Sequence, residues 1–524
     1  MQIHPTRTTV DVAIAGLVVL GAGLAFQVPA LVGWGGALVI GLAIARAVTH
    51  VSVARIRAAG FEMLWRSEPR VRRLARGERV ELEAEVRNRD SRAARYIALR
   101  PVASPLLSVE LEPKAGEVPA GGRLRVRVSV TARRVGRHGM FGLSLEVFGA
   151  PGLFEVPLTF ANPFGIEVLP RAFATRLRSP RGGRSRHSAD DGRPGPLSGE
   201  SLELRELREH QPGDPFKRIA WKATARKGRL MVRDYEREER DVVWLMLDAS
   251  VELWSGEVGR APLDVAIDEV AAVATRHLAR GDRVGLGIFG ARTLEWLKPD
   301  RGAAHAMRLM TSLALAPQTY DADRSDLDEA DVAHRVLEHL RPLDPGAARG
   351  VRSAELDRIA RRADRLRGRA PFPDASVFAE ERRGRSLRRY LACFGLPSPA
   401  RLEPERSRTD RQLASGLARC LRERPSPSLV YVWSPPPDLK ARPEIEKALE
   451  RLPRRKVELR WIAIRLAQDL PRTGSTMAPV VADALSIRAR VAEERGNAAL
   501  RALGVHVDQL KGRASLPPPP PSRS

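Results

Sequence analysis

One stretch of the sequence decides the fold of the C-terminal half: DVVWLMLDAS, residues 241–250. The apolar side chains from Val242 to Leu247 follow one another without alternation, and Asp248 ends the run. A short, uninterrupted apolar run is typical of a strand buried on both faces of a parallel sheet. Parallel sheets belong to doubly wound α/β domains, which bind ligands beyond the carboxyl ends of their strands. Asp248 is therefore the first candidate site residue.

Helix and strand patterns alternate after Asp248. Helical spacing of apolar residues marks 263–279 and 303–315, and strand patterns mark 283–289 and 429–433. Further helices are expected at 410–424, 444–452 and 482–503, and further strands at 293–297, 457–464 and 505–509. The alternation predicts one doubly wound α/β domain over residues 241–512. A proline-rich tail, residues 513–524, is expected to be disordered.

An insertion rich in Arg, Asp and Pro interrupts this domain between residues 320 and 405. It contains helical patches at 328–340 and 354–366 with few large apolar residues. A loop this long inside a domain is usually functional or disordered. Because the insertion directly precedes Thr409, we expect it to emerge beside Asp248. Solvated helices are favoured there over a lid that serves one partner.

Period-two alternation dominates the region before the α/β pattern. Residues 79–86 and 123–130 alternate charged and apolar side chains, and turn signals separate these runs. Several short strands of this kind predict an antiparallel all-β sandwich over residues 58–172. Its charged side chains are expected to form a solvated sheet face. Residues 173–240 then hold a linker, rich in Gly, Ser and Pro at 178–199, and a distinctive segment.

The N-terminal 57 residues contain an apolar stretch with no charged side chain between residues 12 and 45. One membrane-spanning helix needs about 20 apolar residues, so this stretch suits a hairpin of two spans broken at Gln27–Pro29. A cleaved signal peptide would be shorter and would end in a cleavage site. A helix hairpin in a soluble core would need other apolar segments to cover it. We therefore expect two transmembrane helices.

Flanking positive charge gives the orientation of this hairpin. Arg7 precedes it, and Arg46, Arg55 and Arg57 follow it, whereas the turn at Pro29 carries no positive charge. Positive residues flank membrane spans on the cytoplasmic side. The chain is therefore expected in the cytoplasmic membrane with its soluble domains in the cytoplasm.

Composition narrows the class of partner. The net charge is +25, from 88 Lys and Arg against 63 Asp and Glu. The excess is mostly Arg, is spread along the chain and comes with only 5% aromatic residues, so no base-stacking platform is evident. We expect no nucleic-acid partner, and an anionic membrane surface is a sufficient use for the charge. Two cysteines, Cys393 and Cys420, make no disulfide framework.

The distinctive segment reads ELRELREHQPGDPFKRIAWKATAR, residues 203–226. Its Pro-Gly-Asp forms a turn, and Asp214 is expected to cap a short helix that follows. Arg218 and Trp221 lie three residues apart and hence on one face of that helix. Such a pair fits either a clasp within the chain or a docking surface for a partner, and we favour the clasp.

This segment, with the strand that ends at Asp248, resembles the family called domain of unknown function 58. The residues that match the family pattern are Arg208, Gly213, Asp214, Arg218, Ile219, Trp221, Ala225 and Arg226. His210 stands where a Tyr is usual. The order of two spans, a β domain and an α/β domain also agrees. We take Arg208, Asp214, Arg218, Trp221 and Arg226 as candidate binding residues.

The resemblance implies that the α/β domain is of the von Willebrand factor A type. In such domains a metal ion binds to Asp-x-Ser-x-Ser, to a Thr of a second loop and to an Asp of a third. Asp248, Ser250 and Thr409 match, but Glu252 replaces the second Ser and Asp438 is displaced by three residues. We expect a degenerate, metal-free docking surface and no cofactor. A Mg²⁺ ion held by Asp248, Ser250 and Thr409 is the alternative.

The resemblance also implies a partner, an ATPase of the MoxR-type AAA+ class. The sequence holds no nucleophile elbow, phosphate loop or zinc-spaced ligand set, so no enzymatic activity is expected. The leading interpretation is a membrane-anchored adaptor protein that recruits or regulates this ATPase. The alternatives are a metal-dependent hydrolase at Asp248 and a basic protein that binds nucleic acid or the membrane surface.

Overall fold

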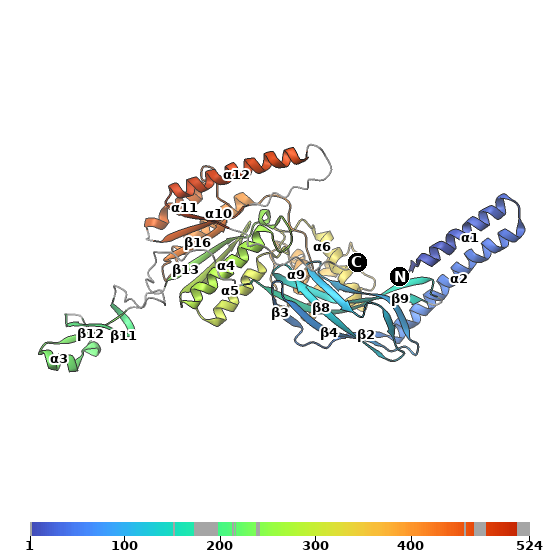
Figure 1. Cartoon of the computed structure of the whole chain (residues 1–524), viewed down its shortest axis with the longest axis horizontal. Coiled ribbons are helices and arrows are strands. Elements are labelled where there is room, and N and C mark those ends of the chain that lie inside the picture. Colours follow the sequence, from blue (N-terminus) through green and yellow to red (C-terminus); the bar gives the residue numbers. More distant parts are fainter. Residues whose placement is uncertain are drawn as a thin grey trace. The chain divides into compact units, whose positions relative to one another are not determined.

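The computed structural model describes residues 3–149, 152–171, 198–211, 214, 216–236, 241–454, 457–465 and 478–510. The chain divides into two compact units, one of Met1–Leu169 with Gln318–Arg401 and one of Pro170–Pro317 with Leu402–Ser524 (Figure 1). Two apolar helices, a strand-rich region and an α/β region follow one another as predicted. Most of the predicted linker at 178–199 and the whole tail at 513–524 lie outside the described residues.

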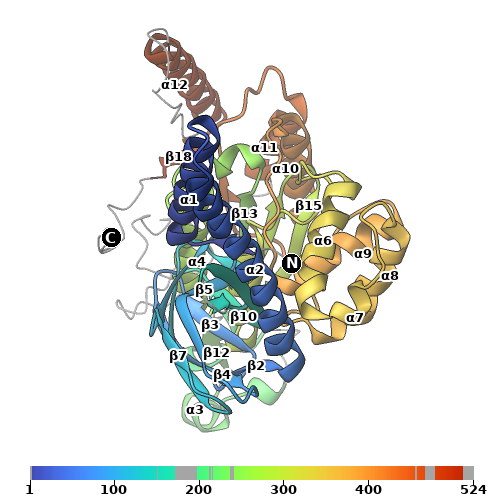
Figure 2. The same ribbon diagram turned by 90° about the vertical axis from the view of Figure 1, so that its right-hand side faces the viewer.

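The chain begins with a hairpin of two apolar helices, α1 (Arg7–Ala25) and α2 (Pro29–Ala59), which lie side by side in Figures 1 and 2. A Cβ on Gly35 would lie 2.4 Å from the Leu20 nitrogen, so the two backbones approach closely there. Small residues allow such approach between helices in membranes. Only 17% and 11% of the apolar windows of α1 and α2 are buried. Both helices are long and apolar enough to span a membrane, which is compatible with anchoring.

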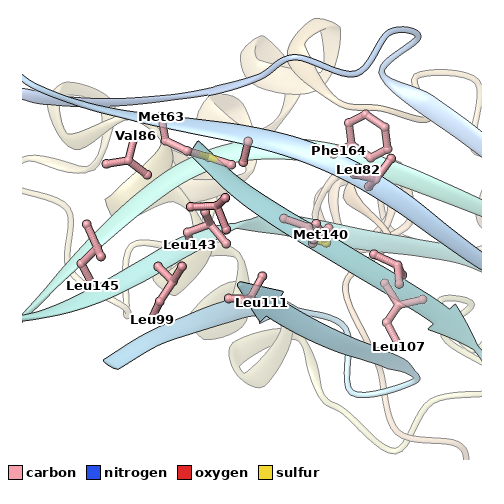
Figure 3. Packing of buried hydrophobic residues seen from close by; sticks show 14 of the residues in the cluster. Met63, Leu82, Val86, Leu99, Leu107, Leu111, Met140, Leu143, Leu145 and Phe164 are labelled. Atoms are coloured by element: carbon pink, nitrogen blue, oxygen red, sulfur yellow. The ribbon is translucent and has the colours of Figure 1, made fainter. Parts of the chain in front are cut away.

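The strand-rich region forms two sheets that share one core. The first has the order β2-β4-β8-β6, and the second has the order β1-β10-β9-β5-β7 with β3 added parallel to β10. Side chains of both sheets point toward one another in Figure 3, among them Leu82 of β4 and Leu143 of β9. The strands are β1 (His4–Pro5), β2 (Phe61–Trp65), β3 (Val71–Ala75), β4 (Arg79–Asn88), β5 (Ala94–Ala103), β6 (Leu107–Glu112), β7 (Gly116–Val118), β8 (Arg123–Ala132), β9 (Gly136–Gly149) and β10 (Phe154–Leu169).

The insertion forms a helical layer with its own core. Its elements are α6 (Glu329–Leu343), α7 (Pro345–Ala348), α8 (Leu356–Leu366), η3 (Arg367–Arg369) and α9 (Arg382–Phe394). Leu337, Ile359 and Leu391 are buried in one cluster between these helices. The layer belongs to the same unit as the strands, and the ring of His339 lies 5.0 Å from that of Phe141.

These helices are not the solvated helices that the sequence predicted, because they close a buried core of their own. Nine Val, Leu and Ile side chains, most of them at helical spacing, close this core together with alanines and three aromatic side chains. The Gly139 amide also donates to the Gly395 carbonyl at 3.1 Å, which joins β9 to the end of α9. The insertion therefore belongs with the β region, although the chain reaches it from the α/β region.

The α/β region has one sheet of order β15-β14-β13-β16-β17-β18, parallel except for the edge strand β15. Its elements are β13 (Val242–Asp248), η2 (Val251–Trp254), α4 (Pro262–Ala279), β14 (Arg283–Phe289), β15 (Thr293–Asp300), α5 (Ala303–Leu315), α10 (Arg406–Cys420), β16 (Leu429–Ser434), α11 (Pro443–Arg454), β17 (Glu458–Ala463), α12 (Ala478–Ala502) and β18 (His506–Gln509). Every residue of β13 is buried, as the apolar run predicts. The strand order reverses between β13 and β16, where such sheets bind ligands.

The segment before β13 forms a small module, residues 198–236, which we call the signature module. Strands β11 (Ser198–Glu209) and β12 (Met231–Glu236) pair antiparallel. Between them lie the short helices η1 (Phe216–Arg218) and α3 (Trp221–Lys227). The helix α3 ends at Gly228, whose φ of 65° is left-handed and suits glycine.

Candidate functional site

The first candidate site lies at the carboxyl end of β13, where Asp248 is completely buried. Its Oδ1 accepts the Ser250 amide at 2.9 Å, and its Oδ2 accepts the Ser434 hydroxyl at 2.8 Å. Ser434 ends β16, so the two central strands are joined at the point where the strand order reverses. The Oδ2 atom also accepts a hydrogen bond from the guanidinium of Arg406.

Arg406 is the first residue of α10 and lies at the centre of an ion-pair cluster. Its Nε donates to Asp410 Oδ1 at 2.7 Å, and its Nη2 donates to Ser434 Oγ at 2.8 Å. Asp410 also pairs with Arg442 at 3.4 Å. Burial disfavours the charge on Arg406, but the carboxylates of Asp248 and Asp410 outweigh it and raise the pKa of the guanidinium. About a quarter of this side chain, 24%, is exposed.

Two glutamates tie the loop after β13 to the start of α10. The Glu405 amide donates to Glu252 Oε1 at 2.7 Å, and the Val251 amide donates to Glu405 Oε1 at 3.1 Å. Thr409 Oγ1 donates to the Glu405 carbonyl at 3.3 Å. Glu252 therefore accepts a backbone amide with the carboxylate that replaces the expected serine.

The structure brings some of the predicted metal ligands together but not all of them. Asp248 ends β13, Ser250 and Glu252 follow it at the start of η2, and Thr409 lies on α10, whose first residue bonds to Asp248. Asp438 is exposed and makes no contact with Asp248 among the described hydrogen bonds and ion pairs. The described residues contain no group of three or more His, Cys, Asp or Glu side chains arranged to hold a metal ion.

Sequence reasoning missed Arg406 and Asp410. Their spacing of four residues places them on one face of a helix only if the helix includes Arg406. We expected that helix to span 410–424, which left Arg406 in a loop. In the structure α10 begins at Arg406, and Glu405 precedes it without a side-chain cap.

The second candidate site is the signature module, where Arg208 and Asp214 form a clasp. Two guanidinium nitrogens of Arg208 donate to the two carboxylate oxygens of Asp214, at 2.8 and 2.6 Å. This bidentate geometry is the strong form of the pair. The Gln211 amide donates to Asp214 as well, at 2.8 Å. The hydrogen bonds from Arg208, followed by that from Gln211, lower the pKa of Asp214 to about 2.

The structure corrects two expectations about the signature module. Asp214 does not cap the helix that carries Trp221, because its oxygens are bound to Arg208 and Gln211. Ala220 is the N-cap of α3 and makes no side-chain cap. Trp221 is not held in a clasp either, since 65% of it is exposed. The side chain of Arg218, in η1, lies outside what the structure describes.

Exposed aromatic and basic side chains share the surface of η1 and α3. Phe216 is 76% exposed, and Trp221 follows five residues later. The exposed cationic residues of the same stretch are Lys217, Lys222, Arg226, Lys227 and Arg229. Arg229 pairs with Glu209 at 2.7 Å. Arg226 and Lys227 also suit the carboxyl end of α3 through the helix dipole.

Residues 206–359 match the family described as "Protein of unknown function DUF58". This match confirms the resemblance inferred from the sequence over that range. The range includes most of the signature module and Asp248, and it ends before Arg406, Asp410 and Ser434. Within the match to DUF58, the Arg208–Asp214 clasp and the exposed Trp221 lie close together in the sequence.

The curated relatives are themselves uncharacterized. The uncharacterized protein Rv1480 of Mycobacterium tuberculosis (strain ATCC 25618 / H37Rv) is 29% identical to this chain over 149 residues. The uncharacterized protein Mb1516 of Mycobacterium bovis (strain ATCC BAA-935 / AF2122/97) matches to the same extent. The alignment covers 28% of this chain and 47% of each relative, so the chain spans about half the length of the curated relatives it matches.

Likenesses to solved structures are weak. The ASH / PapD-like domain of human CEP192 is 15% identical with a TM-score of 0.16, covering 21% of this chain and 82% of that domain. WR4, a C. elegans MSP family member, is 8% identical with a TM-score of 0.14, covering 21% and 94%. TM-scores this low carry no argument about fold or function.

Proposed function

We propose that this chain is a membrane-anchored interaction protein that docks on an acidic partner through its signature module. The observation that carries the proposal is the exposure of Phe216 and Trp221 on a strongly basic surface. Trp is enriched among the residues that dominate binding energy at interfaces. Positive charge around such an anchor selects partners with negative surfaces. The Arg208–Asp214 clasp supports the module by fixing the strand and the turn that lead into η1.

The anchor in this proposal is the α1–α2 hairpin, which crosses the membrane twice. Large apolar side chains on both helices are exposed, among them Leu17 at 60%, Trp34 at 72% and Ile40 at 62%. Exposed apolar surface of this extent favours lipid as its environment. The arginines that flank the hairpin favour a cytoplasmic location for the rest of the chain.

The partner we propose is a MoxR-type AAA+ ATPase, on the grounds of the family resemblance. The α/β region is proposed to be an A-type domain, which its strand order and its polar loop at Asp248 support. An adaptor of this kind would hold the ATPase at the inner face of the membrane. Catalysis is not part of the proposal, because the Asp248 carboxylate is held by Arg406 and Ser434.

The test is the affinity of the full chain, in lipid nanodiscs, for the purified ATPase of the same genome. Trp221→Ala is expected to weaken binding roughly 30-fold, the effect of losing about 2 kcal/mol at an interface hot spot. The matched control is Leu402→Ala, because Leu402 is 90% exposed and lies outside the module. Lys222→Glu should weaken binding too, and raised salt should reduce its effect. Equal binding by wild type and Trp221→Ala would refute the proposal.

Nucleic acid is the competing ligand for a basic surface with exposed aromatic rings. The same nanodiscs, incubated with single-stranded DNA or RNA, separate the two interpretations. The proposal expects retention of the ATPase and no saturable binding of nucleic acid at physiological salt. Saturable binding of nucleic acid that Trp221→Ala abolishes would favour the alternative.

A further inference from the structure

The cluster around Arg406 holds a positive charge at the place where A-type domains hold a metal ion. Asp248 ends β13, Ser434 ends the adjacent β16, and α10 presents Arg406 and Asp410 to both. We propose that the guanidinium of Arg406 takes the place of a divalent cation at this site. In this chain the Asp248 site is therefore closed to Mg²⁺, and its cation is part of the polypeptide.

The oxygen donors show why the metal does not fit. Mg²⁺ takes six oxygen ligands in near-ideal octahedral geometry, several of them water, and proteins usually hold it through one or two carboxylates. Asp248 Oδ1 is bound to the Ser250 amide, and Asp248 Oδ2 is bound to Arg406 and Ser434. The hydroxyl of Thr409 donates to a backbone carbonyl. Three expected ligand atoms thus have protein partners already.

The charges of the cluster lead to the same conclusion. The carboxylates of Asp248 and Asp410 face the guanidinium groups of Arg406 and Arg442, so two negative charges meet two positive ones. A dication entering this group would have to displace Arg406 and leave its partly buried guanidinium without its partners. Breaking a buried, hydrogen-bonded pair in this way is strongly unfavourable.

Two buried polar atoms beside Asp248 have no hydrogen-bond partner in the described part of the chain. The Ser250 hydroxyl is buried and has no hydrogen-bond partner in the described part of the chain. A buried hydroxyl of this kind can be satisfied by a single water molecule. Glu252 Oε2 is likewise buried and without such a partner, but Glu252 Oε1 is bound to the Glu405 amide. These two atoms alone do not supply the ligands of Mg²⁺.

A closed Asp248 site also affects contacts that do not involve the docking proposed above. Any contact made by the carboxyl end of this sheet does not depend on divalent cations. Chelators should leave it unchanged, unlike contacts of an A-type domain that holds a metal ion.

The test uses Mn²⁺ as the probe and the full chain in nanodiscs. Titration followed by electron paramagnetic resonance counts the Mn²⁺ ions that are bound. Wild type is expected to show no saturable binding that depends on Asp248. Arg406→Gln removes the charge but retains a polar side chain, and it should gain one saturable Mn²⁺ site per chain that wild type lacks. The double variant Arg406→Gln with Asp248→Asn should lose that gain.

Arg411→Gln is the matched control, because Arg411 lies on the same helix, is exposed and donates to the Ser407 carbonyl, with no described contact to Asp248 or Asp410. It should bind Mn²⁺ as wild type does. If Arg406→Gln fails to fold, as judged by its thermal melt, Arg406→Met replaces it, because Met also removes the charge and keeps a long side chain, and the same gain is expected. In Arg406→Lys, which retains the charge, binding of Mn²⁺ should remain absent. Saturable Mn²⁺ binding by wild type that Asp248→Asn abolishes would overturn the inference, and so would a folded Arg406→Gln that gains none.

Discussion

The buried ring of His339 predicts a loss of stability of its unit in mild acid. His339 lies on α6 and is 8% exposed. It packs against the rings of Phe141, Tyr390 and Phe394, with centroids 4.9 to 5.7 Å away, and its Nδ1 lies 2.9 Å from the Tyr390 hydroxyl. Burial among these rings lowers the pKa of His339 from 6.5 to about 4.

The size of the effect follows from this pKa shift. Below pH 6.5 the unfolded chain binds a proton that the folded chain does not, so stability falls as the pH falls, until the folded histidine also binds a proton near pH 4. Between pH 7 and pH 5 this one histidine is expected to reduce the free energy of unfolding by about 2 kcal/mol, roughly a 30-fold increase in the unfolded fraction. Burial also lowers the pKa of His138 to about 4, so His138 should reduce the free energy of unfolding further over the same pH range.

A native thiol provides the assay. Cys393 lies on α9 in the core of the helical layer and is fully buried, so a thiol reagent active in mild acid reaches it only through opening of that core. Cys420→Ala removes the other thiol. In His339→Phe the free energy of opening, measured from the rate of thiol modification, should fall between pH 7 and pH 5 by about 2 kcal/mol less than in the parent. His334→Phe on the same helix is the control, since His334 is 57% exposed. An unchanged decline in His339→Phe would refute the reasoning.

Three further variants test other parts of the structure. Gly35→Leu should separate α1 from α2 and reduce the amount of protein in the membrane fraction, whereas Gly33→Leu should not, since a Cβ on Gly33 meets nothing within 4 Å. Asp214→Asn should open the clasp of the signature module and weaken binding of the ATPase in nanodiscs, without changing the thermal melt of the α/β region. Asp248→Asn should destabilise the α/β region by about 2–4 kcal/mol, because it leaves a buried cation with one partner fewer. The rate of thiol modification at Cys420, buried in α10, measures that loss.

The sequence predicted the elements whose pattern is local and periodic. The unbroken apolar run of β13 predicted a buried strand, and the uncharged stretch of the hairpin predicted two apolar helices. The structure contains both. Asp248 was identified for the same reason, since a polar residue that ends a buried parallel strand lies at the ligand-binding edge. These inferences need no knowledge of which distant segments meet.

Arg406 could not be identified in this way. In a chain so rich in arginine, one more arginine before a helix carries no distinctive signal. Its role depends on the end of β16 lying beside the end of β13, and on α10 beginning one turn earlier than its pattern suggested. Both conditions depend on contacts between distant segments of the chain, which a local sequence pattern does not show.

The insertion and Trp221 illustrate two other limits. Period and composition suggested solvated helices, but contacts with the β region decide where that layer packs. The spacing of Arg218 and Trp221 places them on one face of a helix but does not say whether the face is covered. In the structure the Trp221 side chain is exposed.

The most direct test of the proposed docking is photocross-linking at the position of Trp221 in native membranes. A benzoyl-phenylalanine in place of Trp221 presents a reactive group on the exposed face of α3, and the same residue in place of Leu402 serves as the comparison. The account predicts a covalent adduct with the MoxR-type ATPase from position 221 and little or none from position 402. Equal adducts from both positions, or none with the ATPase from position 221, would contradict it.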